Sequence, residues 1–280
     1  MVKIVNMEPL NPTLTKITLE APHIAKKVKA GQFGILRVDE DGERFPLTIE
    51  DWDEEKGTIS FVFQIAGAST MRMNHKKPGE YIADVVGPLG NPTDLDNAKS
   101  VCVVAGGSGC AIGFPVIREL NKRGVDVDAV IGFRNKDLVV LENEIRELTN
   151  HCVVMTDDGS YATKGLVTEG LQSLIDSGRK YDKVITLGPL PMMKFVCLLT
   201  KKYGIKTLAS MNPIMVDGTG MCGGCRLTVG GETKFACVDG PEFDGHLIDF
   251  DEAMARSTMY HEHEAKEREK VCNMFKMEVK

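Results

Sequence analysis

Three cysteines and one aspartate near the C-terminus place the strongest constraint on what this chain can fold into. Cys222, Cys225 and Cys237 have C-x2-C-x11-C spacing, and Asp217 lies five residues before Cys222. A [2Fe–2S] cluster is commonly held by a tight C-x4-C-x2-C loop and a distant fourth cysteine, and here Asp217 stands in the place of the first cysteine. Four glycines separate these residues, and glycine reaches the backbone angles with which a tight loop aims N–H groups at sulfur. The motif therefore predicts an iron–sulfur module with these four residues as metal ligands.

Two alternatives stay open for this motif. A CxxC knuckle also binds zinc, but structural zinc sites usually have two paired knuckles, whereas this chain has one pair and a single further cysteine. The fourth ligand is open as well, because a carboxylate is a harder donor than a thiolate. Asp239 and Cys272 are the alternatives to Asp217.

Length and charge limit the class of protein. With 280 residues, the chain is long enough for two domains and a small third module. The net charge of −6 argues against a nucleic-acid partner, because phosphate binding needs clustered lysine and arginine. No apolar run approaches the ~20 residues of a membrane span, and the N-terminus lacks the layout of a signal peptide. We therefore expect no membrane partner and a cytoplasmic protein.

The other cysteines fit the same compartment. Cys102 and Cys110 flank a glycine-rich turn, and Cys152 and Cys197 lie in apolar surroundings. We expect buried or inert thiols at these four positions, as in a reducing cytoplasm.

Residues 1–98 have the pattern of a small β-barrel. Apolar and polar residues alternate over 14–19, 33–38 and 59–63. Glycine-containing turn sequences separate these runs at spacings typical of short antiparallel strands. No long helix is expected in this part.

Residues 99–205 have the pattern of an α/β domain. Buried strands are expected at 101–105, 127–132, 153–156 and 183–188, with helices near 111–123, 142–148 and 165–177. Strand–helix alternation builds an open parallel sheet with helices on both faces, and ligands bind at the carboxyl ends of its strands. The remaining chain divides into the cluster module, 206–245, and a helical tail, 246–280, whose mixed charges indicate a solvated face. His261 and His263 are two residues apart and do not form a metal pair on a helix.

Glycines and polar residues follow several strands of the α/β domain. The first strand ends in Gly106, Gly107, Ser108 and Gly109, which could cradle a phosphate against the next helix, although the G-x-G-x-x-G spacing is not met. A turn that needs positive φ is the alternative. Further candidates at later strand ends are Arg134, Asp157, Asp158, Gly188, Pro189 and Met192. Together they favour nucleotide binding.

Two segments of the barrel are candidates for a flavin site. Arg44 could pair with a phosphate, and Thr48 could donate to a flavin edge. Residues 67–70 form a small-residue turn whose N–H groups and hydroxyls suit a diphosphate. A strand end and a hairpin turn are the alternatives.

These segments together resemble the ferredoxin–NADP reductase superfamily across nearly the whole chain. The resemblance is carried by Pro46-Leu47-Thr48, the turns at 67–70 and 105–109, the segment 188–193 and the three-cysteine module. Within the superfamily the chain is similar to the electron-transfer subunits of dihydroorotate dehydrogenase. The aspartate in the cluster motif makes it most similar to the small subunits of NADH-dependent reduced ferredoxin:NADP+ oxidoreductase, of sulfide dehydrogenase type.

The resemblance implies three cofactors: FAD on the barrel, NAD(H) on the parallel sheet and a [2Fe–2S] cluster that faces a partner. The implied FAD contacts are Pro46, Leu47, Thr48, Val62, Phe63, Gln64, Gly67, Ser69 and Thr70. The implied NAD(H) contacts are Gly106, Gly107, Ser108 and Gly109, with Asp157, Asp158, Gly188, Pro189 and Met192 near the nicotinamide. The relatives carry arginine directly before the flavin-motif proline, where this chain has Phe45. Arg44 is one place earlier, and a shift of one residue turns a side chain to the other face of a strand.

The implied function is a relay. We expect hydride exchange between NAD(H) and FAD, then transfer of single electrons through the cluster to a larger flavin and [4Fe–4S] subunit of an electron-bifurcating heterodimer. No catalytic side chain is expected, and NAD(H) is favoured over NADP(H) by the resemblance alone. The alternatives are an electron-transfer subunit of dihydroorotate dehydrogenase and, in a different class, a zinc-stabilised nucleotide-binding adaptor.

Overall fold

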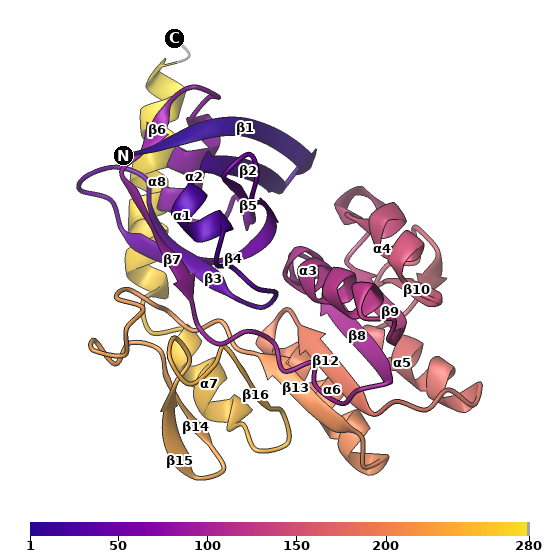
Figure 1. Ribbon diagram of the computed structural model, residues 1–280. Coiled ribbons are helices and arrows are strands. Elements are labelled where there is room, and N and C mark those ends of the chain that lie inside the picture. The colour runs from indigo at the N-terminus through magenta and orange to yellow at the C-terminus, as the bar shows by residue number, and fades with distance from the viewer. Residues whose placement is uncertain (279–280) are drawn as a thin grey trace.

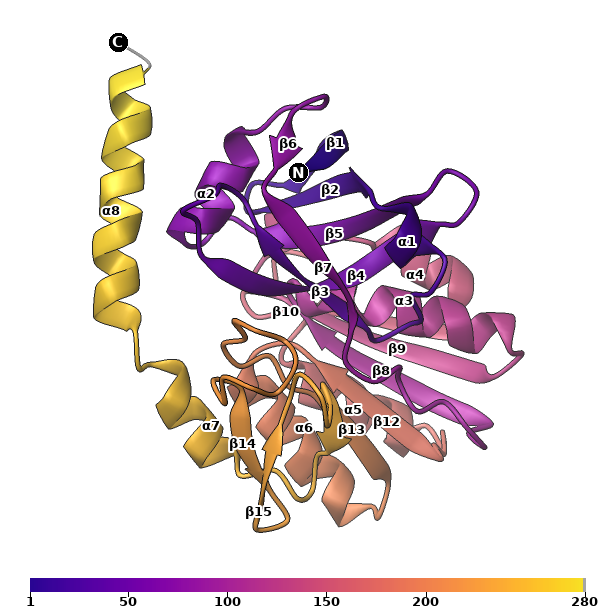
Figure 2. The same cartoon turned by 60° about the vertical axis from the view of Figure 1, so that its left-hand side comes forward.

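The computed structural model describes residues 1–278 and divides them into three packed parts (Figures 1 and 2). A curled antiparallel sheet at the N-terminus lies beside a parallel α/β sheet. The cysteine-bearing segment lies below the curled sheet, next to the edge of the parallel sheet (Figure 1). A long C-terminal helix leaves this segment and runs back along the N-terminal sheet (Figure 2).

The N-terminal sheet confirms the predicted barrel-like domain. Its strand order is β6-β1-β2-β5-β4-β3-β7, and one face of its strands buries a common core that includes Ile17, Phe61 and Phe63. The strands are β1 (Val2–Asn11), β2 (Leu14–Glu20), β3 (Phe33–Arg37), β4 (Arg44–Asp53), β5 (Thr58–Gln64), β6 (Tyr81–Ile82) and β7 (Asp84–Leu89). Two helices, α1 (Pro22–Ala25) and α2 (Ala68–His75), accompany them. The segment 67–70 is thus the start of α2, where the sequence predicted only a turn.

The second sheet confirms the predicted parallel α/β arrangement. Its order is β11-β10-β9-β8-β12-β13-β16, and only the last pair is antiparallel. The strands are β8 (Ser100–Gly106), β9 (Asp126–Phe133), β10 (His151–Thr156), β11 (Thr163–Lys164), β12 (Lys183–Leu187), β13 (Lys206–Ser210) and β16 (Glu242–Asp244). The chain winds outwards from β8 to β10 and then returns past β8 to β12. Such a reversal opens a ligand-binding crevice at the carboxyl ends of β8 and β12.

Helices cover both faces of this sheet. They are α3 (Gly109–Lys122), α4 (Glu142–Leu148), α5 (Val167–Asp176) and α6 (Leu190–Lys202), with a short 3-10 turn, η1 (Lys136–Leu138). Apolar residues of α3 and α4 pack on one face, and those of α5 and α6 pack on the other. The sequence did not predict α6, which begins within the segment interpreted as a strand end. No helix within residues 1–278 is long and apolar enough to cross a membrane.

The cysteine-bearing segment is built around a small hairpin. Its strands are β14 (Arg226–Val229) and β15 (Glu232–Phe235), and the helices α7 (Phe250–Ser257) and α8 (His261–Glu278) follow. Both β13 and β16 belong to the parallel sheet, although they lie within the range 206–245 that the sequence assigned to the cluster module. We therefore propose that this module begins after β13 and shares its last strand with the α/β domain.

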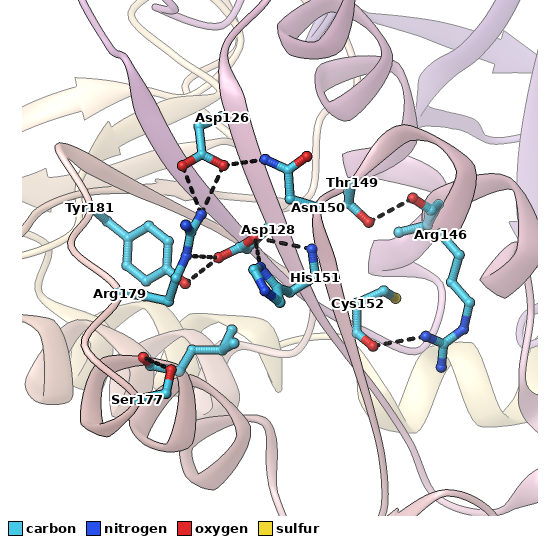
Figure 3. A network of polar contacts seen from close by, with 12 residues as sticks. Asp126, Asp128, Arg146, Thr149, Asn150, His151, Cys152, Ser177, Arg179 and Tyr181 are labelled. Carbon is cyan, nitrogen blue, oxygen red and sulfur yellow. Dashed lines mark hydrogen bonds and ion pairs between the residues drawn. The ribbon is translucent and has the colours of Figure 1, made fainter.

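A buried polar network closes the amino-terminal edge of the parallel sheet (Figure 3). Asp128 of β9 is fully buried and accepts from Arg179 Nε at 2.7 Å and from Tyr181 Oη at 2.6 Å. His151 Nδ1 lies 2.9 Å from the other carboxylate oxygen. A buried carboxylate is tolerated when it is paired and hydrogen-bonded in this way. The network stabilises the edge of the sheet that lies opposite the crevice.

The linker between the two sheets is fastened to β16. Asn91 N donates to Gly240 O at 2.7 Å, and Thr93 Oγ1 donates to Glu242 Oε1 at 2.8 Å. The second oxygen, Glu242 Oε2, is buried and has no partner among the described residues. Burial raises the pKa of this carboxyl to about 7, against the smaller opposing effects of Thr93 and Lys183. The carboxyl is therefore held protonated at mildly acidic pH.

This raised pKa predicts a loss of stability with rising pH. The folded chain binds the Glu242 proton more tightly than the unfolded chain, so the free energy of unfolding falls as pH rises from about 4.5 through about 7 and then levels off. The contribution is on the order of 3 kcal/mol. We expect Glu242→Gln to flatten this part of the pH profile in a thermal unfolding series, whereas Asp244→Asn, at an exposed carboxylate of the same strand, leaves it unchanged. An unaltered slope in Glu242→Gln would contradict the assignment.

Candidate cofactor sites

The glycine-rich turn after β8 meets the turn after β12 at the crevice. A Cβ added to Gly109 would lie 2.3 Å from Leu187 O, so only glycine allows this close approach of the two chain segments. A Cβ added to Gly106 would lie 2.4 Å from Met192 Sδ, and one added to Gly188 would lie 3.0 Å from Gly106 O. The structure therefore brings the predicted residues 106–109 together with Gly188 and Met192.

The start of α3 faces the same crevice. Ser108 precedes this 14-residue helix and makes no capping hydrogen bond through its side chain. The first turn of such a helix has free N–H groups and the positive end of the helix dipole, which suit a phosphate. Gly107 has a φ of 57°, and nothing lies within 4 Å of the Cβ position that a side chain would fill. Gly107 therefore has the positive φ that the alternative interpretation of this turn required. This backbone angle is compatible with a turn that also binds a phosphate.

The other strand-end candidates lie further along the same edge. Arg134 follows β9, and Asp157 and Asp158 follow β10, so two strands separate the aspartates from β12. Three strand spacings amount to about 14 Å. Asp158 Oδ1 accepts from Ser160 N at 2.9 Å, and the pKa of Asp158 is lowered mainly by Ser160. The aspartates therefore lie at a different strand end from Gly188, along the same edge of the sheet.

The two faces of β4 separate Arg44 from Phe45. Arg44 pairs with Arg37 across the strands, and its Nη2 lies 3.6 Å from Asp84 Oδ1. Phe45 packs towards the barrel core and lines a hollow beside α2. Arg44 and Phe45 therefore lie on opposite faces of β4, and Arg44 is directed to Asp84 rather than to the hollow.

The remaining flavin candidates divide between the surface and the core. Pro46, Leu47 and Thr48 are partly exposed, whereas Phe63 is 1% exposed and belongs to the barrel core. Only the backbone of Phe63 could contact a flavin. Its neighbours Val62 and Gln64 point to the other face of β5, and Val62 packs against the α/β domain.

The predicted diphosphate turn forms the start of α2 and lines a hollow of about 430 Å³. Thr70 Oγ1 accepts from the N–H groups of Ala66 and Gly67 at 3.1 Å each, and Ser69 Oγ donates to Glu43 Oε2 at 3.0 Å. The hollow has the size of a small-molecule site. Its other wall is helix α8, which sequence reasoning excluded as a site because its charges were interpreted as a solvated face.

The cysteine loop aims backbone N–H groups at sulfur, as the glycines predicted. Cys222 is exposed, and N–H groups of Gly224, Asp217 and Val216 lower the pKa of its thiol, that of Gly224 most strongly. Gly218, Gly220 and Gly223 have positive φ values of 83°, 83° and 66°. These angles bend the loop so that its amides converge on the thiol.

The ligand candidates gather as two pairs. Cys225 and Cys237 are buried, and their thiols lie within hydrogen-bonding reach of each other. Burial and then this contact raise the pKa of Cys237 to about 12. Asp217 and Cys222 form the second pair, linked by the N–H of Asp217. Among the described residues, no three His, Cys, Asp or Glu side chains are placed to hold one metal ion together.

Asp217 also shapes its own loop. Its Oδ2 accepts from Thr219 N at 2.9 Å, from Thr219 Oγ1 at 2.6 Å and from Met221 N at 3.2 Å. The hydroxyl of Thr219 contributes most to lowering the pKa of this carboxyl. An ionised carboxylate with one oxygen committed to the loop retains Oδ1 for a metal.

The cysteine loop rests directly on the barrel. A Cβ added to Gly218 would lie 2.7 Å from Leu89 Cδ1 and 2.8 Å from Ile35 Cδ1. Sequence spacing gave no sign of this contact, which links the Asp217 end of the loop to strands β3 and β7. The contact fixes the predicted cluster site against the N-terminal sheet.

Comparisons with known proteins agree with this arrangement. Residues 212–249 match the model of the iron-sulfur cluster binding domain of dihydroorotate dehydrogenase B. The chain is 43% identical to a dihydroorotate dehydrogenase B (NAD(+)) electron transfer subunit homolog from Thermotoga maritima, over 88% of this chain and 86% of that one. It belongs to the family of dihydroorotate dehydrogenase B electron-transfer subunits and their homologues.

Two further matches extend over nearly the whole chain. An uncharacterized protein in the adh 3' region of Clostridium beijerinckii is 48% identical over 95% of this chain and 93% of that one. The solved structure of an NADH-dependent reduced ferredoxin-NADP oxidoreductase, described for flavin-based electron bifurcation, contains a chain that is 40% identical. That match has a TM-score of 0.91 and covers 96% of this chain and 97% of the other. The resemblance to this family, the ferredoxin-reductase-like fold and the class of flavin, nicotinamide and iron–sulfur oxidoreductase subunit are confirmed.

Substitution of the candidate residues tests which side chain is the fourth ligand of the cluster. We expect Asp217→Ala to lower the iron content and Asp217→Cys to retain the cluster with a changed visible spectrum, because a thiolate replaces a harder carboxylate donor. Asp239→Ala is the matched control, since Asp239 Oδ2 accepts from Phe235 N at 2.7 Å and serves the hairpin. If the visible spectrum changed in Asp239→Ala and in neither Asp217 variant, Asp239 and not Asp217 would be the fourth ligand of the cluster.

Proposed function

We propose that this chain exchanges hydride between NAD(H) and FAD and relays single electrons through a [2Fe–2S] cluster to a larger flavin and [4Fe–4S] subunit. In this proposal the pair forms an electron-bifurcating NADH-dependent ferredoxin:NADP+ oxidoreductase in the cytoplasm. The proposal draws on the family, on the solved relative for which electron bifurcation is described, and on the arrangement of the three parts.

One apolar core carries the proposal because it joins all three candidate sites. It contains Phe33 and Ile35 of β3, Met193 of α6, and Cys225 and Cys237. Strand β3 pairs with the flavin strand β4, and α6 follows the turn at Gly188. A nucleotide, a flavin and a cluster at these places would therefore be neighbours, as electron transfer between them requires.

The residues present fit the proposed cofactors. Residues 106–109 and the start of α3 would hold the phosphates of NAD(H), and the start of α2 would hold the flavin diphosphate. Pro46 and Thr48 would lie along the flavin, and the four loop residues would hold the cluster. When bound, the cofactors supply hydride and one-electron chemistry, while the protein positions them and excludes water.

Apolar side chains around the cysteine loop support a partner subunit. Met221 is 87% exposed, and Val216 and Val238 are 45% and 42% exposed. Exposed apolar groups beside a redox site are typical of a protein interface. The alternative partner, a dihydroorotate dehydrogenase, is favoured by the name of the Thermotoga relative, whereas an aspartate in place of the first cysteine speaks against it.

Anaerobic isolation of the chain from its own cells tests the proposal. We expect flavin, about two iron and two acid-labile sulfide per chain, and a co-purifying larger subunit with its own flavin and iron. A dihydroorotate dehydrogenase as the co-purifying protein would favour the alternative. Colourless, zinc-containing protein would contradict both and support a zinc-stabilised adaptor.

A further inference from the structure

We propose that the C-terminal helix α8 forms one wall of the flavin site and that Arg268 binds the diphosphate of the bound flavin. This inference rests on the proposed function, which supplies the flavin. It assigns a binding residue to the charged tail, far in sequence from the barrel segments that form the rest of the site.

Helix α8 is fixed to the barrel through α2. It stands apart from the other helices and runs alongside α2 (Figure 2). The rings of His75 and Phe275 stack with centroids 3.4 Å apart and planes inclined by 11°. Cys272 Sγ lies 3.9 Å from Met71 Sδ, and Val271 is 1% exposed although the helix around it is mostly solvated. The second half of α8 therefore anchors the helix, and its first half is held across the start of α2.

The hollow of about 430 Å³ lies between these two helices. Its barrel side consists of Glu43, Phe45 and residues 66–70, and its other side consists of His261, Glu264, Ala265, Glu267 and Arg268. Gly67, which precedes α2, has no side chain that could cap the helix, and Ala68, Ser69 and Thr70 of the first turn line the hollow. The N–H groups of this turn are thus left without a side-chain cap beside the hollow, as a diphosphate site requires.

The charged side chains that line the hollow include one arginine, Arg268. Lys270 Nζ lies 2.6 Å from Glu267 Oε1, so one of the three carboxylates is paired with a cation, whereas Glu43 accepts from the uncharged Ser69 hydroxyl. Arg268 is exposed and makes no ion pair within the part of the chain that the structure describes. The barrel contributes Phe45 here and directs Arg44 to Asp84 on the other face of β4. Arg268 is therefore the guanidinium available to the hollow.

An arginine at this place suits a diphosphate. Its planar guanidinium donates two parallel hydrogen bonds to phosphate oxygens, which a lysine does not do. The carboxylates of Glu43 and Glu264 would repel a diphosphate unless a cation lies beside them. Arg268 supplies that cation. Because helix α8 is already packed against α2, little conformational freedom of the protein is lost when the flavin binds.

Release of flavin from the purified full-length holoprotein tests the role of Arg268. We expect Arg268→Ala to accelerate release about tenfold or more, because a charge-assisted hydrogen bond is lost. Arg268→Lys is expected to release flavin at a rate between those of the wild type and Arg268→Ala. Added salt should speed the release of flavin from the wild type more than from Arg268→Ala. Lys266→Ala is the matched control, since Lys266 lies on the same helix and does not line the hollow.

The outcomes separate this inference from the function on which it rests. Equal release rates and equal salt dependence in wild type and Arg268→Ala would overturn the role of Arg268 while the flavin stays bound. Faster release from Lys266→Ala to the same extent would overturn it as well, because any loss of positive charge would then suffice. Wild-type protein isolated without flavin would overturn the proposed function itself.

Discussion

Replacing Gly109 by alanine is expected to destabilise the α/β domain by about 3 kcal/mol and to lower Tm by roughly 10 °C. The added Cβ would lie 2.3 Å from Leu187 O and 2.8 Å from Leu187 C, and backbone atoms of a central strand cannot rotate away. Either α3 or β12 must move, and both border the crevice. Binding of NADH should therefore fall together with Tm, as isothermal titration and thermal unfolding would show.

Gly113→Ala is the control for this prediction. Gly113 lies one turn further along α3, where an added Cβ would meet Val103 Cγ1 at 3.2 Å and Leu187 Cδ1 at 3.3 Å. These are ends of flexible side chains that can shift by a few tenths of an ångström. We expect a small change in Tm and nearly normal NADH binding. If Gly109→Ala behaved like Gly113→Ala, the close contact between the two turns would be refuted.

Replacing Cys225 by serine is expected to remove the iron–sulfur cluster and to spare the flavin. Cys225 is 1% exposed and lies in the core that joins the cysteine loop to β3 and α6. Its thiol contacts that of Cys237, so one substitution removes half of a ligand pair. We expect loss of iron and acid-labile sulfide, with NADH still able to reduce the flavin but with no cluster to accept electrons from it.

Cys272→Ala is the control for the cysteine prediction. Cys272 lies on α8 against Met71 and α2, away from the cysteine loop. The sequence left it as an alternative fourth ligand, and the structure removes it from the loop. Iron content should therefore be unchanged in Cys272→Ala. Loss of iron from this variant, with iron retained in Cys225→Ser, would show that the ligand set is wrong.

The sequence predicted the elements that a local pattern determines. Helix α4 spans the predicted residues 142–148, and α5, β9 and β12 lie within two or three residues of their predicted bounds. The parallel sheet followed from strand–helix alternation, and the cysteine loop followed from spacing and glycines. Each of these elements is determined by the periodicity or spacing of residues within one short segment, so the local sequence is enough to predict it.

The parts that escaped prediction depend on contacts distant in sequence. The start of α2 was interpreted as a turn, because the small residues 67–70 lack an apolar period. The opposite directions of Arg44 and Phe45 follow from the pairing of β4 with β3, which a single strand does not reveal. The tail was interpreted as solvated, and most of α8 is, but Val271 and Phe275 dock it on α2. Only two or three apolar residues of that helix indicated in the sequence that one side of it is packed.

Anaerobic addition of NADH to the purified full-length chain, followed by absorbance and electron paramagnetic resonance, tests the central claim most directly. We predict that NADH bleaches the flavin absorbance and produces the signal of a reduced [2Fe–2S] cluster, and that Cys225→Ser retains the first change and loses the second. Flavin and cluster that both stay oxidised, or a cluster signal that persists in Cys225→Ser, would contradict it.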